Sequence, residues 1–139
     1  FNLSSLPDTL SNAANMFSGC SSENNKFNLG KLPDSIVYAQ YMFQNSGNSE
    51  IIISSLPSNI RYAQYLFSNA YNAKINLDEL AKNAPDDGFK KLTSINYLFY
   101  KAGSGNNPGT VTGSRSAFLA KCPSGISTLY TFDDTNTTY

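Results

Sequence analysis

The sequence predicts an α/β solenoid in which each coil is one short strand followed by one short helix. One pattern recurs three times: apolar, x, apolar, x, x, Leu, Pro, x, x, apolar, x, x, Ala, x, x, Met or Leu, Phe, in segments 1–17, 27–43 and 51–67. A unit this short cannot bury a strand face and a helix face alone. The copies must therefore stack on one another and share a core.

The 139 residues form one domain in this interpretation. A fourth unit opens at Ile75, lacks the proline and carries an insertion, AKNAPDDGF. A degenerate fifth unit is indicated by Pro108 and Phe118, which are spaced as Pro33 and Phe43 are. We expect four repeats, then a fifth with an irregular C-terminal cap: 1–26, 27–50, 51–74, 75–102 and 103–139.

The first half of each repeat predicts a short strand. Phe27 and Leu29 are two residues apart, as are Ile51 and Ile53, and this spacing places side chains on one face of a strand. Pro33 then fixes φ and removes an N–H donor, so the chain turns or begins a helix there.

The second half predicts a helix of about two turns. Ile36, Ala39 and Phe43 follow a helical spacing, and Asp34 or Ser35 would cap the start. Residues that tolerate left-handed backbone follow each Phe and would end the helices: Gly19, Asn45 and Asn69.

Stacked coils place equivalent residues over one another, so the pattern also predicts the core. We expect three ladders of apolar side chains. They are Phe1, Phe27, Ile51 and Ile75; Leu6, Leu32, Leu56 and Leu80; and Phe17, Phe43, Phe67 and Phe99.

Composition excludes several functions. Ten Lys and Arg balance ten Asp and Glu, which leaves no electrostatic footprint for nucleic acid, and no apolar run is long enough to span a membrane. Without histidine the chain has no Ser-His-Asp triad, no Cys-His dyad and no His-ligated zinc. Asn and Ser make up 36 of 139 residues, a composition typical of an exported surface protein.

The motifs resemble a known family. LPDSI followed by MF, and then MFSGCSS at 16–22, resemble the BspA-type leucine-rich repeats and the related repeat of bacterial surface lipoproteins. AFLAKC at 117–122 is a weaker match to the same repeat. The resemblance implies a leucine-rich-repeat-like solenoid, secreted or anchored at a cell surface, that serves adhesion.

Candidates for chemistry are few, and we expect no catalytic residue, no metal site and no cofactor. Cys20 and Cys122 lie in distant coils and are predicted to stay free thiols. Asp86-Asp87-Gly88 fits a solvated turn better than a weak calcium site. Asp8 and Asp34 are paired carboxylates in successive coils, where helix capping explains them better than glycoside hydrolysis.

Tyrosine supplies the candidate ligand-binding surface. Five rings fall in two equivalent positions and are expected on one flank: Tyr38 and Tyr62 in one, Tyr41, Tyr65 and Tyr97 in the other. They would stack on sugars or anchor a protein interface. Alternatively, they only cover the apolar layer beneath.

These observations favour a non-enzymatic recognition or adhesion module with a protein or glycan ligand. The alternative is a structural subunit of an extracellular fibre, sheath or virion assembly. Phe1 already occupies a strand position with no polar cap before it. We therefore expect the N-terminal edge to be covered, either by more of the same polypeptide or by self-association.

Overall fold

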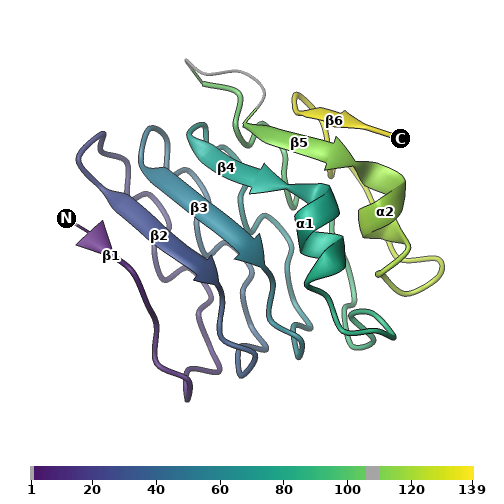
Figure 1. Ribbon diagram of the computed structural model, residues 1–139. Helices are drawn as coiled ribbons and strands as arrows, with labels where there is room; N and C mark the ends of the chain where they lie inside the picture. The colour runs from purple at the N-terminus through teal and green to yellow at the C-terminus, as the bar shows by residue number, and fades with distance from the viewer. Residues whose placement is uncertain (1, 106–109) are drawn as a thin grey trace.

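The computed structural model describes residues 2–105 and 110–139 and shows a parallel β-solenoid of about six turns (Figure 1). One sheet runs along the solenoid, and its strands lie in chain order with every neighbouring pair parallel. The strands are β1 (Asn2–Leu3), β2 (Lys26–Lys31), β3 (Glu50–Ser55), β4 (Ala73–Asn76), β5 (Val111–Ser114) and β6 (Asn136–Thr138). The predicted repeat solenoid is confirmed.

Alternation along the strands places one face of the sheet in the core. In β2 and β3 the inward side chains Phe27, Leu29, Ile51 and Ile53 are buried, while their neighbours face outward. The returning half of each coil covers this face from behind (Figure 1). No helix in the described part of the chain is long and apolar enough to cross a membrane.

Phenylalanine rings form a continuous ladder through the core. Ring centroids are 5.3 Å apart from Phe17 to Phe43, 5.8 Å from Phe43 to Phe67 and 5.8 Å from Phe67 to Phe99. The predicted ladder is confirmed over these four coils. In the fifth coil Phe132 continues it, stacked 6.0 Å from Phe99.

Phe118 therefore does not hold the ladder position that the sequence predicts for it. It meets Phe99 edge-on at 5.6 Å and lies 6.4 Å from Phe89, within an insertion-bearing part of the core. Pro108, on which that alignment also depends, lies outside the described residues.

The predicted ladder of strand residues, Phe1, Phe27, Ile51 and Ile75, is wrong at both ends. Phe27 pairs with Leu3, and Ile51 pairs with Ala73 rather than Ile75. In the first coil the number of residues explains the shift: Leu3 and Phe27 are 24 residues apart, whereas the bridged pair Asn12 and Tyr38 is 26 apart. The segment from the strand to the bridged residue is therefore two residues shorter in the first coil than in the second. The predicted member Phe1 lies outside the described residues.

The predicted helices in the first three coils are also wrong. Within segment 36–43, Tyr38 forms bridges to the neighbouring coils and residues 40–43 belong to a run of turns. The N–H of Ala39 donates to the carbonyl of Tyr62 in the next coil (2.9 Å), while the N–H of Met42 donates to Ala39 in its own coil (3.2 Å). A helix would keep every such bond local. Stacking instead gives alternate N–H groups an acceptor in the neighbouring coil. The backbone of this segment is therefore hydrogen-bonded without forming a helix.

Left-handed residues close these turns. The predicted positions Gly19, Asn45 and Asn69 have φ values of 76°, 58° and 57°. They therefore have the expected conformation, but each ends a run of turns instead of a helix.

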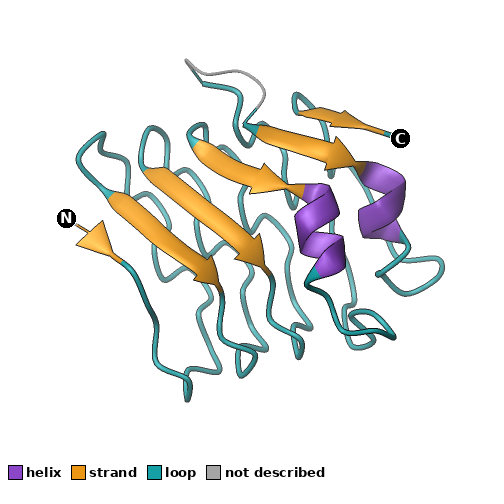
Figure 2. Ribbon diagram, in the orientation of Figure 1, coloured by secondary structure: helices purple, strands orange, loops and turns teal. Residues whose placement is uncertain are grey.

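Two short helices occur in the later coils (Figure 2): α1 (Leu77–Lys82) directly follows β4, and α2 (Arg115–Leu119) directly follows β5. The Asn76 side chain caps α1 by accepting from the N–H groups of Asp78 (2.8 Å) and Glu79 (3.2 Å). The fourth coil lacks the proline of the first three, so its chain continues from strand into helix. A strand followed by a helix is thus found only in the fourth and fifth coils of the described chain.

Candidate functional site

The five predicted tyrosines lie together in two stacked rows, which we call the tyrosine surface. In one row the ring centroids of Tyr38 and Tyr62 are 5.2 Å apart. In the other, Tyr65 lies 5.0 Å from Tyr41 and 4.6 Å from Tyr97, with interplanar angles of 14° and 7°. Regular stacking of the turns brings these rings into register.

The longer row continues beyond the predicted residues. Tyr130 lies 5.1 Å from Tyr97 at an angle of 40°, and Tyr100 meets Tyr97 edge-on at 5.3 Å. The signal for Tyr130 was present in the sequence, because it precedes Phe132 by two residues just as Tyr97 precedes Phe99.

The tyrosines of the longer row have an unusual backbone. Tyr41, Tyr65, Tyr97 and Tyr130 all have positive φ, between 52° and 60°. This region favours Gly and Asn, and the first coil has Asn15 there, at φ 60°. A bulky residue held in it costs on the order of 1 kcal/mol or more. The packing between coils compensates for this strain at four successive positions.

Exclusion of solvent also changes the pKa of one phenol in this row. The pKa of Tyr97 is raised, first by desolvation and then by the neighbouring phenols of Tyr65 and Tyr130. The shift favours the protonated phenol, which can donate a hydrogen bond.

A shallow hollow opens beside the two rows. Ser94 and Ser127, bridged to each other, occupy the positions that Tyr38 and Tyr62 hold in earlier coils, so the shorter row of rings stops there. The complete lining is Gln40, Tyr41, Gln64, Tyr65, Ser94, Asn96, Tyr97, Ser127 and Leu129.

Amide side chains form part of this lining. The Oδ1 atom of Asn96 accepts from Ser127 Oγ (2.7 Å) and from the N–H of Leu129 (2.8 Å). The Oε1 atoms of Gln40 and Gln64 are buried and have no hydrogen-bond partner among the described residues. A buried carbonyl oxygen without a donor is costly, at about 1–3 kcal/mol.

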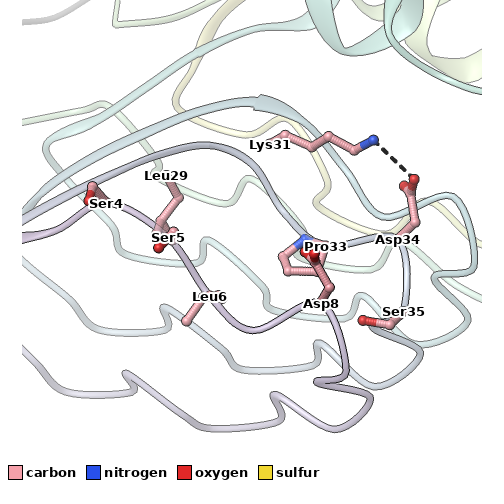
Figure 3. A pocket seen from close by; sticks show the side chains of 9 residues that line it. All are labelled: Ser4, Ser5, Leu6, Asp8, Leu29, Lys31, Pro33, Asp34 and Ser35. Atoms are coloured by element: carbon pink, nitrogen blue, oxygen red, sulfur yellow. Dashed lines mark ion pairs between the residues drawn. The ribbon is translucent and has the colours of Figure 1, made fainter.

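A second hollow lies near the N-terminal coil (Figure 3) and contains the carboxylates Asp8 and Asp34. Asp34 pairs with Lys31 at 3.0 Å and accepts the N–H of Ser58 from the next coil at 2.9 Å. That backbone bond is the main reason why the pKa of Asp34 is lowered. Asp34 thus caps a neighbouring coil instead of the start of a helix in its own coil. A carboxylate held ionised in this way is a poor general acid.

The remaining acidic candidate is a turn. Asp87 pairs with Lys90 three residues later, and this partner lowers the pKa of the carboxyl. Within the described residues there is no cluster of His, Cys, Asp and Glu that could hold a metal ion.

Both cysteines are free thiols, as predicted. Cys122 Sγ lies 3.6 Å from the Phe118 carbonyl oxygen, and burial raises the pKa of Cys122 from its ordinary 9.0 to about 12. At pH 8.5 its thiolate population is then roughly a thousandfold lower than in the unfolded chain. We therefore expect iodoacetamide to modify Cys122 far more slowly in the folded protein than in urea.

This pKa also predicts the direction of a pH effect on stability. The folded thiol holds its proton more tightly, so its contribution is fully present below pH 9 and is lost as the pH rises towards 12. Between pH 8 and 10.5, urea melts of the parent should lose more stability than those of Cys122→Ala. If both proteins lose the same amount, the thiol is not the source.

No protein-family model, curated protein or solved structure matches this chain. Its own side-chain geometry is therefore the basis for the function proposed below.

Proposed function

We propose that this chain is a non-enzymatic recognition or adhesion module, secreted or displayed at a cell surface, that binds a protein or glycan ligand through the tyrosine surface. In this proposal it is a leucine-rich-repeat-like solenoid of the BspA type. The observation that carries the proposal is the pair of stacked tyrosine rows on one flank.

The strained backbone supports a role beyond packing. Asn would fill the left-handed position without strain, as Asn15 does, yet three predicted tyrosines occupy it: Tyr41, Tyr65 and Tyr97. Strained residues that neighbouring structure holds in place cluster at ligand-binding sites. Within a row the ring faces cover one another, so a ligand meets ring edges and phenol hydroxyls. Such a surface combines rigid apolar area with polar tips.

Substituting asparagine for tyrosine tests the proposal. In Tyr41→Asn and Tyr65→Asn, the lost stacking of about 0.5–1.5 kcal/mol is offset by relief of backbone strain. We expect stability to change by less than about 1 kcal/mol in thermal melts. Binding to ligands identified on a glycan and extracellular-matrix array should fall by about tenfold or more.

The matched control is Tyr139→Asn, which removes a ring that is 90% exposed and lies outside the two rows. Its binding should equal that of the parent. Unchanged ligand binding in the double variant Tyr41→Asn/Tyr65→Asn would leave the tyrosines with a purely structural role.

The alternative, a building block of an extracellular fibre, sheath or virion assembly, is favoured by the first coil. Leu3, Leu6, Leu10 and Phe17 are only partly buried, although the equivalent residues of the second coil are buried. Stacking of this coil on another subunit would bury them. Light scattering over a range of concentrations separates the two functions, because a module stays monomeric and a building block polymerises.

A further inference from the structure

The hollow beside Ser94 and Ser127 is the place where the array of rings is interrupted. The second and third coils each contribute one ring to the shorter row, Tyr38 and Tyr62 respectively. The next two coils contribute serines at the same position, while the longer row continues through Tyr97. The missing rings leave room beside the rows for a ring supplied by a ligand.

The lining restricts the charge of that ligand. None of the nine residues around the hollow carries a formal charge at neutral pH. A phosphate, sulfate or carboxylate would find no cation there, and an amine would find no carboxylate. The ligand that fits this lining is therefore neutral.

The lining also favours a ligand that donates hydrogen bonds, as hydroxyl groups do. Amide, phenol and serine side chains both donate and accept hydrogen bonds. Two of these groups, the Oε1 atoms of Gln40 and Gln64, have no donor among the residues that the structure describes. Both glutamines line the hollow, and the terminal torsion of glutamine is soft, so their amide groups can adjust to a ligand bound there. A purely apolar ligand would leave these oxygens unpaired, whereas a ligand hydroxyl supplies the missing donor.

We infer that the hollow binds one ring of a neutral sugar, either as a free hexose or as part of a glycan. The inference rests on the proposed recognition function and assigns its ligand class. The sugar ring lies in the hollow against Tyr65 and Tyr97, and its hydroxyls donate to Gln40 and Gln64.

The test compares binding of the full chain to neutral, sialylated and sulfated oligosaccharides on one array, with free methyl hexosides as competitors. Neutral oligosaccharides should bind. Competition by free hexosides identifies a single-ring ligand, whereas its absence identifies a ring that binds as part of a longer glycan; both agree with the inference.

Two variants locate the site. Ser94 lines the hollow, so the added ring of Ser94→Tyr should obstruct it and abolish binding while the thermal melt is kept. Gln64→Leu removes an unpaired buried oxygen, so it should not lower the melting temperature, yet it should weaken binding by about three- to tenfold. Ser124→Tyr adds the same ring at an exposed turn outside the hollow and should bind like the parent.

Three results would overturn the inference. They are a preference for charged oligosaccharides, unchanged neutral-sugar binding in both Ser94→Tyr and Gln64→Leu, and no binding to any oligosaccharide. A ligand that depends on Tyr41 and Tyr65 but tolerates Ser94→Tyr overturns only the sugar site and leaves the proposed recognition function standing. If ligand binding is also unchanged by the substitutions of Tyr41 and Tyr65, both the sugar site and the proposed recognition function are overturned.

Discussion

Phe67→Ala is expected to lower the free energy of unfolding by about 3–5 kcal/mol. The ring is fully buried and lies between Phe43 and Phe99, with centroids 5.8 Å away on each side. Its removal leaves a cavity in the middle of the ladder, which both neighbouring coils share. The loss is measured by urea unfolding of the variant and the parent.

Phe17→Ala is the matched control, because it truncates the same ring at the end of the ladder. Phe17 is only partly buried and stacks on a single ladder neighbour, Phe43. It should cost about 1–2 kcal/mol, roughly the transfer free energy of a partly buried ring. Equal losses at the two positions would show that the ladder is not a continuous core.

Gly113→Ala is expected to destabilise the protein by about 3 kcal/mol or more. Gly113 in β5 has φ +97°, and an added Cβ would lie 2.9 Å from Leu77 N and 3.0 Å from both Asn76 Oδ1 and Asp78 N. These atoms belong to the cap of α1, so the substitution disturbs the cap as well as straining the backbone. Urea melts and the far-ultraviolet circular dichroism of the variant measure the two effects.

Gly125→Ala separates strain from collision. Gly125 has φ +75°, and nothing lies within 4 Å of an added Cβ. It should cost only the backbone term, about 1 kcal/mol. A Gly113→Ala variant as stable as Gly125→Ala would mean that β5 does not approach α1 closely.

The repeat itself could be predicted from sequence, because the stacked architecture depends on residues that recur at fixed positions. Phe43, Phe67 and Phe99 end equivalent segments, and this recurrence places their rings together whatever backbone joins them. The same logic brought Tyr41 and Tyr65 into one row.

The backbone of the second half-coil could not be predicted from apolar spacing. Ile36, Ala39 and Phe43 fit one face of a helix, but they also fit a run of turns whose alternate N–H groups bond to the next coil. The choice depends on partners about 24 residues away, which periodicity within one repeat does not contain. One local signal favoured turns: Asn15 and Gly19, four residues apart, both tolerate left-handed backbone.

The hollow beside Ser94 and Ser127 could not be predicted from the sequence for a related reason. It depends on aligning Ser94 and Ser127 with Tyr62, and the insertion before Leu92 and the irregular fifth coil obscure that alignment. The unpaired oxygen of Gln64 appears only when its surroundings are complete.

The hydrogen bonds between coils have a mechanical consequence. Bonds such as that from Phe43 N to Leu66 O join successive coils and therefore run along the solenoid axis. Tension on the two ends loads them along their length, one coil at a time, so the outermost coil peels away before the next is strained. Phe27 and Ile51, paired across one coil boundary, are 24 residues apart, so each release lengthens the chain by roughly 80 Å. A solenoid built in this way would yield under tension in steps, one coil at a time from its ends.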